Sequence, residues 1–244
     1  MKTIREVLLL IVLAATPAVS RSDGLPTPAT GALSTAEPVF DKAVSRVGYL
    51  SDVGRYEEAW ALCDSLREAF PDHPAPYLYT ASVYVSWMLS HRLSDYEDEV
   101  DANVERAIEV GTRLQKPSTD AWLSSHVGSA YGLRAMARVR RHNWSGAYMD
   151  GRRSIGHLRA ALERDPRLYD LYFQLGGYHY WRTARSSFIR VVAFWMRDRR
   201  ELGLQQMELV VPHGRYIRHG ALHGIALALM MPGVSAPPLP SNNQ

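Results

Sequence analysis

The sequence has a single cysteine, Cys63, among its 244 residues. One thiol cannot close a disulfide within the chain, so a fold held by cross-links is excluded, as is a metal site built from several cysteines. A lone cysteine in an apolar stretch is usually a buried packing residue, and we expect this of Cys63. The fold must therefore be held together by the packing of its side chains.

The sequence also lacks a terminal apolar run long enough to cross a membrane, which takes about 20 residues. The apolar residues 7–15 follow Lys2 and Arg5 and precede the small-residue pattern Ala18-Val19-Ser20. This order predicts a secretory signal peptide over residues 1–20, cleaved near Ser20. We therefore expect an exported protein, either periplasmic or secreted.

Apolar anchors are scarce in two further stretches. Residues 21–36 and 232–244 are rich in proline and in small or polar residues, and neither shows a helical period. Such segments bury too little apolar surface to fold. We predict a disordered linker over 21–36 and a disordered tail over 232–244, which leaves residues 37–231 as the folded domain.

Strand-like alternation of apolar and polar residues is absent from this domain, whereas prolines occur in it at a regular interval. Pro71, Pro117, Pro166 and Pro212 each close a helix-like run, and they lie 46, 49 and 46 residues apart. A period of this length is typical of one helical hairpin repeated along the chain, because a single hairpin cannot bury its apolar face alone. The predicted fold class is all-α.

A pair of small residues follows each of the first three prolines, and aromatic residues flank it at helical spacing. The small residue allows a neighbouring helix to approach closely while the aromatic side chains fill the flanks. The pairs are Ala81-Ser82, Gly128-Ser129 and Gly176-Gly177.

These motifs resemble the tetratricopeptide repeat (TPR) family, whose first helix reads W-x-x-L-G-x-x-Y and whose second helix carries a small residue, a large residue and a closing proline. The resemblance implies a right-handed α-solenoid of stacked antiparallel hairpins over residues 37–231. The matching motifs are Ser124-x-x-Val127-Gly128-x-x-Tyr131, Tyr172-x-x-Leu175-Gly176-x-x-His179, the weaker Tyr77-x-x-Thr80-Ala81-x-x-Tyr84, and the second-helix series Ala59, Cys63, Leu66 and Pro71.

The later repeats are about 12 residues longer than the family pattern. At a rise of about 1.5 Å per residue, this length adds one to two turns to both helices or inserts an ordered loop. The polar stretch 90–101 favours a loop in the second repeat, with Ser94 and Asp95 as candidate helix caps.

Charge is divided between the two halves of the chain. Residues 21–120 hold 9 basic and 17 acidic residues, whereas residues 121–244 hold 17 basic residues, all arginine, and 7 acidic residues. This division favours an acidic partner for the second half or head-to-tail association of copies. The sequence carries no nucleic-acid-binding signature, so we expect no nucleic-acid partner.

The TPR resemblance implies a non-enzymatic scaffold of the cell envelope or periplasm that binds a protein or acidic peptide segment in its concave groove. Aromatic residues beside arginine are typical of recognition hot spots, and guanidinium groups match carboxylates. An alternative interpretation places Tyr180 and Trp181 in the core. The predicted groove residues are Trp122, Ser125, Ser129, Leu133, Arg134, Arg138, Asp170, Phe173, Gly177, Tyr180, Trp181, Arg182 and Arg185.

Two other functions are open from sequence alone. Residues 185–200 contain an apolar run between arginines, which is typical of a basic amphipathic helix on a membrane surface. His219 and His223 are spaced as zinc ligands on a helix would be, with His213 nearby, but no acidic residue lies between them. A metal-dependent enzyme is therefore less favoured, and we predict no catalytic residues, no metal and no cofactor.

The last predicted helix, residues 217–231, has no second helix to pair with before the proline-rich tail. Since a solenoid usually needs a polar cap at such an end, we expect an apolar face that is partly uncovered. This predicts self-association through the 217–231 helix, or a truncated reading frame.

Overall fold

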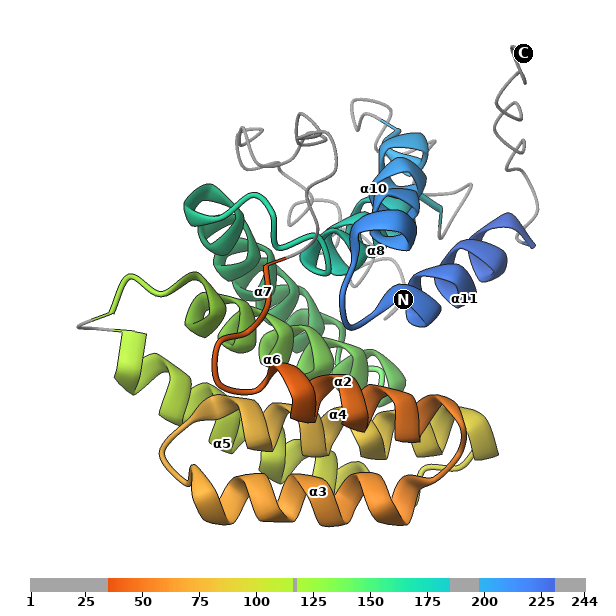
Figure 1. The fold of residues 1–244 in the computed structure, drawn as a ribbon. Coiled ribbons are helices and arrows are strands. Elements are labelled where there is room, and N and C mark those ends of the chain that lie inside the picture. The colour runs from red at the N-terminus through yellow and green to blue at the C-terminus, as the bar shows by residue number, and fades with distance from the viewer. Residues whose placement is uncertain (1–34, 116–117, 185–197, 231–244) are drawn as a thin grey trace, which may run out of the picture.

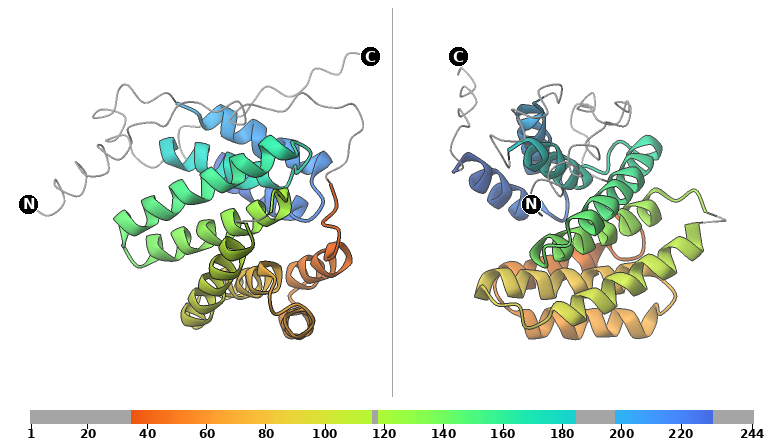
Figure 2. Two further views of the ribbon diagram at one scale, coloured as in Figure 1. Left: turned by 90° about the vertical axis from the view of Figure 1, so that its left-hand side faces the viewer. Right: turned by 180° about the vertical axis from the view of Figure 1, so that it is seen from behind.

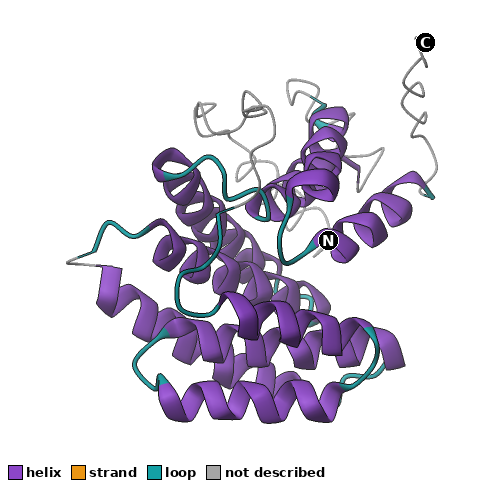
Figure 3. Ribbon diagram, viewed as in Figure 1, coloured by secondary structure: helices purple, strands orange, loops and turns teal. Residues whose placement is uncertain are grey.

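The computed structural model describes residues 35–115, 118–184 and 198–230. Every regular element in these ranges is a helix, and no strand occurs there, so the predicted all-α class is confirmed for this part of the chain (Figure 3). The predicted signal peptide and tail, and most of the predicted linker, lie outside the described residues. The helices are α2 (Asp41–Asp52), α3 (Tyr56–Ala69), α4 (Pro74–His91), α5 (Glu97–Gln115), α6 (Ala121–Arg140), α7 (Trp144–Arg164), α8 (Leu171–Ala184), α10 (Arg200–His213) and α11 (Arg218–Leu229).

Side chains just ahead of three helices satisfy amide groups of the first turn. The imidazole of His73 accepts from the backbone of Ala75 at 3.2 Å ahead of α4, whose first residue is Pro74. The carboxylate of Asp120 and the amide oxygen of Asn143 cap α6 and α7 in the same way. These caps fix where the helices begin, because the first amide groups of a helix lack partners within it.

The helices end close to the prolines, as predicted. Helix α3 ends at Ala69, two residues before Pro71, and α7 ends at Arg164, two residues before Pro166. Helix α5 ends at Gln115, and Pro117 lies outside the described residues. Pro212 is the exception, since it lies inside the last turn of α10, which ends at His213.

The small residues of the repeat lie at close helix contacts, which confirms their predicted packing role. A Cβ atom at Gly128 would lie 3.0 Å from Leu158 of α7. A Cβ atom at Gly176 would lie 2.6 Å from the carbonyl oxygen of Gly203 in α10. The backbones of α8 and α10 thus approach each other as closely as two glycines allow.

The extra residues predicted for the second and third repeats lengthen helices, whereas α8 and α10 of the fourth have 14 residues each. Helices α4 to α7 have 18, 19, 20 and 21 residues, whereas α2 and α3 have 12 and 14. The predicted loop over 90–101 is therefore wrong in extent, because α4 continues to His91 and α5 begins at Glu97. Arg92 ends α4 in a left-handed conformation with φ of 56°. Ser94 and Asp95 lie in the short connection that remains.

Each helix packs against the next described helix along the chain, and we call this array of helices from α2 to α11 the stack (Figures 1 and 2). Alternate helices are also in contact, namely α2 with α4, α4 with α6, α6 with α8 and α8 with α11. In contrast, α3, α5 and α7 barely touch one another. The alternate helices therefore form the inner layer of the stack.

The two ends of this stack meet. Glu37, just before α2, donates its backbone N–H to the hydroxyl of Tyr216, which lies between α10 and α11. Further along α2, the carboxylate of Asp52 lies 3.2 Å from the imidazole of His219 on α11. The first described helix is thus held to the connection ahead of α11 and to the start of α11 itself.

Helix α11 leaves part of its apolar surface exposed, as expected. Leu222, Leu229 and Met230 are exposed, whereas Ala221 and Ala228 are buried. Ile225 packs against the cluster that contains Tyr180. Self-association through this helix remains a prediction.

Candidate functional site

Several predicted groove residues are buried inside the stack. Trp122 and Ser125 of α6 and Tyr180 of α8 are 8 %, 4 % and 0 % exposed. The hydroxyl of Tyr180 donates to the backbone oxygen of Ala228 at 2.6 Å, which ties α8 to α11. These buried side chains cannot line an open groove, since the ring of Tyr216 packs against Trp122 and α11 lies against Tyr180. The core interpretation of Tyr180 is confirmed.

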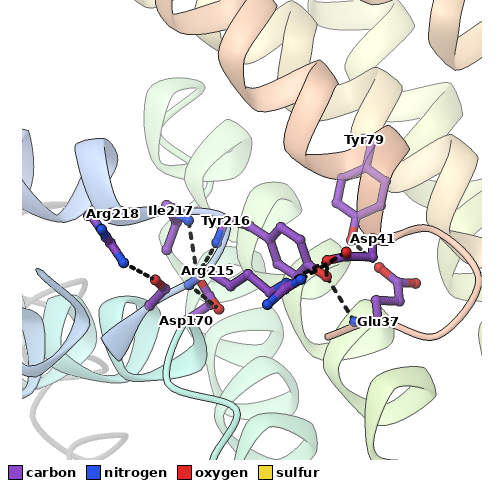
Figure 4. Close-up of polar contacts among 9 residues, drawn as sticks. Glu37, Asp41, Tyr79, Asp170, Arg215, Tyr216, Ile217 and Arg218 are labelled. Carbon is purple, nitrogen blue, oxygen red and sulfur yellow. Dashed lines mark hydrogen bonds and ion pairs between the residues drawn. The ribbon is translucent and has the colours of Figure 1, made fainter. Parts of the chain in front are cut away.

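Asp170 is also buried, and its role is structural. Its carboxylate accepts from the backbone N–H groups of Arg215, Tyr216 and Ile217 at 2.7 to 3.0 Å (Figure 4). A carboxylate with this many amide donors organises the turn that leads into α11. Asp170 therefore holds the connection between α10 and α11 against the start of α8 and is not available to a partner.

The remaining predicted groove residues are only partly accessible. Ser129 accepts from the side-chain amide of Gln174 at 2.7 Å, which joins α6 to α8. Leu133, Phe173 and Gly177 are half-buried, and Phe173 packs against α11 near Gly224. The side chains of Trp181 and Arg182 and the whole of Arg185 lie outside the described residues.

Arg134 and Arg138, two of the four arginines predicted for the groove, lie on α6 within two turns of its connection to α7. Arg134 makes two hydrogen bonds to the carboxylate of Asp150, at 2.8 and 3.0 Å. Arg138 lies 2.8 Å from the same carboxylate, and Arg153 lies 3.3 Å from it. We call these four residues the arginine cluster. Asp150 is 0 % exposed, whereas the side chains of Arg134, Arg138 and Arg153 are 16 %, 30 % and 50 % exposed.

An aromatic platform adjoins the arginine cluster. The guanidinium groups of Arg134 and Arg153 lie 5.1 and 5.7 Å from the centre of the Tyr131 ring. This ring stacks on the imidazole of His157 at 5.7 Å and 10°. Burial and the neighbouring charge of Arg164 lower the pKa of His157, so its ring is neutral near pH 7. The surface thus offers arginines and two flat rings together.

A second polar group lies on the inner layer and was missed by sequence reasoning. The carboxylate of Glu37 is 2 % exposed and accepts from the hydroxyl of Tyr79 at 2.8 Å (Figure 4). Its other oxygen lies 3.0 Å from the Nε2 atom of His126, although the two are not aligned as a hydrogen bond. Burial, followed by the charge of Glu37, raises the pKa of Tyr79 well above its usual value, so this hydroxyl is a neutral donor.

The residues next to Glu37 extend this group. Asp41 pairs with Arg215 and accepts from the hydroxyl of Tyr216 at 2.8 Å. The hydrogen bond from Arg215, with lesser help from Tyr216, holds the pKa of Asp41 below its usual value. In the sequence, Glu37 stands at the predicted domain boundary, where no periodic pattern marks it. Its partners become visible only when chain segments far apart are brought together.

The C-terminal histidines do not converge. His213 packs on the ring of Tyr169 with centroids 4.9 Å apart, while His219 faces Asp52. In the described ranges, no three His, Cys, Asp or Glu side chains are placed to hold a metal ion. Cys63 is buried as predicted, and burial raises the pKa of its thiol to about 12.

None of the helices in the described ranges is long and apolar enough to cross a membrane. The basic amphipathic segment on which the membrane-surface alternative depends lies largely outside these ranges, over residues 185–197. Comparisons of the chain with protein-family models, with curated proteins and with solved structures find no match.

Proposed function

We propose that this chain is a TPR-like helical-repeat adaptor, without enzymatic activity, that binds an acidic segment of a partner protein at the arginine cluster. The solenoid assignment is supported by the inner layer, in which alternate helices touch while the outer ones barely do. That pattern is expected when antiparallel hairpins stack in line. Its place in the cell envelope or periplasm rests on the predicted signal peptide.

The observation that carries the binding proposal is the charge balance at Asp150. Three guanidinium groups surround one carboxylate, so the group carries a surplus of two positive charges. Other ion pairs on the surface are balanced, such as Arg106 with Glu109 and Arg113 with Asp72. A partly exposed surplus of arginine is suited to carboxylates from outside the chain, because a guanidinium group can donate to two carboxylates at once.

The platform next to it adds specificity for an aromatic or planar group. Tyr131 and His157 are stacked beside Arg153, the most exposed member of the cluster. Aromatic side chains and arginine together dominate the free energy of many protein interfaces. The best ligand is therefore an acidic segment that carries an aromatic residue.

Binding of a fluorescein-labelled peptide with six glutamates and one phenylalanine tests this proposal by fluorescence anisotropy. The double variant Arg138→Gln/Arg153→Gln leaves Arg134 to satisfy Asp150, so the fold is retained while two charges are lost. We expect its Kd to rise at least tenfold, since hydrogen bonds to charged groups contribute about 1.5–3 kcal/mol each.

The matched control is Arg106→Gln/Arg113→Gln, which removes two arginines of similar exposure from α5. This control variant should bind the acidic peptide as tightly as the unmodified protein does. A peptide with glutamine in place of each glutamate should bind neither the control variant nor the unmodified protein. Equal affinity of both double variants for the acidic peptide would refute the proposed site.

A further inference from the structure

The short segment of residues 35–41, which ends at the first residue of α2, contacts parts of the chain that are remote in sequence. Thr35 donates its backbone N–H to the carbonyl oxygen of Arg167 at 3.2 Å and its hydroxyl to Asp165 at 2.8 Å. From this connection between α7 and α8 the segment crosses to α2, as Figure 1 shows in red. We call residues 35–41 the N-terminal segment.

Three side chains anchor the N-terminal segment. Glu37 is buried between Tyr79 and His126, as described above. Phe40 is 1 % exposed and packs against the rings of Phe70 and His73, with centroids 5.0 and 4.7 Å apart. Asp41 pairs with Arg215 and Tyr216. Pro38 and Val39, between the anchors, are exposed.

The groups that receive Glu37 belong to other helices. Tyr79 lies on α4, His126 on α6, and Tyr216 before α11, where its hydroxyl accepts the backbone N–H of Glu37. A carboxylate is costly to bury unless its surroundings supply hydrogen bonds, so this part of the inner layer is built to receive one. The N-terminal segment therefore lies in the stack as a short peptide lies in a receptor.

We propose that the inner layer carries a peptide-binding site and that the N-terminal segment occupies it in cis. The site accepts a carboxylate, then an aromatic ring three residues later, and then a second carboxylate at the next position, as in Glu37, Phe40 and Asp41. The external ligand is a segment of a partner protein with this pattern, which competes with the resident segment. This inference is independent of the arginine cluster, which lies at the opposite end of the α6–α7 hairpin.

The probe is a labelled peptide with the chain's own sequence TAEPVFDK, added to the full-length protein. The variant Glu37→Gln/Asp41→Asn weakens the resident segment and leaves the receiving side chains intact. We expect the peptide to bind this variant at least tenfold more tightly than the unmodified protein. The gain should disappear with the peptide TAQPVFNK, and also when Tyr79→Phe is added to the variant.

Hydrogen exchange of the unmodified protein provides a second test that does not depend on the variant being folded. An excess of unlabelled TAEPVFDK should accelerate amide exchange in residues 35–41 while the protection of α4 and α6 is unchanged. Unchanged exchange at saturating peptide, or equal affinity of the peptide for variant and unmodified protein, would overturn the inference. Binding of TAEPVFDK should not change in Arg138→Gln/Arg153→Gln, which separates this site from the proposed function.

Discussion

At the scale of single residues, the contact between Gly176 and Gly203 sets the spacing of α8 and α10. A Cβ atom at Gly203 would lie 2.6 Å from the carbonyl oxygen of Gly176 and 2.7 Å from the backbone nitrogen of Tyr180. A clash with backbone atoms cannot be relieved by a change of side-chain rotamer. Gly203→Ala should therefore lower the free energy of unfolding by about 1–3 kcal/mol, as overpacked cores do.

The matched control for this substitution is Gly156→Ala on the exposed side of α7, where an added Cβ meets nothing within 4 Å. Alanine is the better helix former, so this change should stabilise the protein by about 0.5–1 kcal/mol. Urea unfolding followed by circular dichroism measures both values. If the two variants were equally stable, the close approach of α8 and α10 would be wrong.

A second residue-scale prediction concerns the stability of the protein at acidic pH, which depends on His73. Burial, together with the neighbouring His126, lowers the pKa of His73 to about 4, against an ordinary value of 6.5. Between pH 6.5 and about 4 the unfolded chain binds a proton at this position that the folded protein does not. Stability should therefore fall as the pH is lowered through this window, because a depressed histidine pKa favours the unfolded state in acid.

The variant His73→Asn tests this contribution, because asparagine retains an acceptor for the backbone of Ala75 and does not titrate. Its melting temperature should depend less steeply on pH between 6.5 and 4 than that of the unmodified protein. Some slope should remain, since the pKa of His157 is lowered in the same direction. An unchanged slope would show that His73 does not carry the effect.

At the scale of elements, Asp170 holds α11 in place. The variant Asp170→Ala leaves three backbone N–H groups, at Arg215, Tyr216 and Ile217, without their acceptor. A lost partner for buried amide groups costs about 1–3 kcal/mol each, so the turn should open. We expect faster hydrogen exchange over residues 214–229, with α4 and α5 unchanged. Uniform loss of protection in all helices would contradict this local role.

The elements also show which features the sequence could predict. Helix ends at Pro71 and Pro166, and the packing role of Gly128 and Gly176, follow from local rules on proline and on small residues between large ones. Glu37 and Asp170 could not be assigned in this way. Tyr79 and Tyr216 lie 42 and 179 residues from Glu37, and the amide donors to Asp170 lie 45 to 47 residues from it, and contacts at such distances leave no periodic trace.

The groove prediction is wrong for four buried residues, and the reason is related. These residues are Trp122, Ser125, Asp170 and Tyr180. Their spacing along α6, and from the residue before α8 into α8, is that of an inner-layer face, and they do lie there. What the spacing cannot show is that the chain itself covers this face, with the N-terminal segment on one side and α11 on the other.

At the scale of the whole molecule, the unequal charge of the two halves is partly neutralised within the fold. Arg140 and Arg141 of the basic half pair with Glu97 of the acidic half, and Arg141 also pairs with Asp101. Arg215 pairs with Asp41 across the meeting ends. The arginine cluster remains as a surplus because its only acidic neighbour in these pairings, Asp150, is shared by three guanidinium groups.

The meeting of the ends predicts coupling between them. In an open array of repeats each unit depends only on its neighbours, so a change near α11 should leave α2 unaffected. Here Tyr216→Phe removes the hydroxyl that contacts Glu37 and Asp41. We expect faster hydrogen exchange in α2, whereas Tyr49→Phe, on the exposed side of α2, should have little effect. Equal protection of α2 in both variants would indicate an open array.

The same closure has a consequence for the order of folding during synthesis. Asp41 is translated 174 residues before its partner Arg215. At about 5–20 residues per second, the ribosome needs roughly 10–35 s to cover that distance. Helix α2 is thus the first described helix to be made, yet the contacts that hold its start are completed only when the last helices emerge. Until then, Glu37 and Phe40 lack their contacts with Tyr216. A chaperone could bind these residues of the nascent chain during that interval.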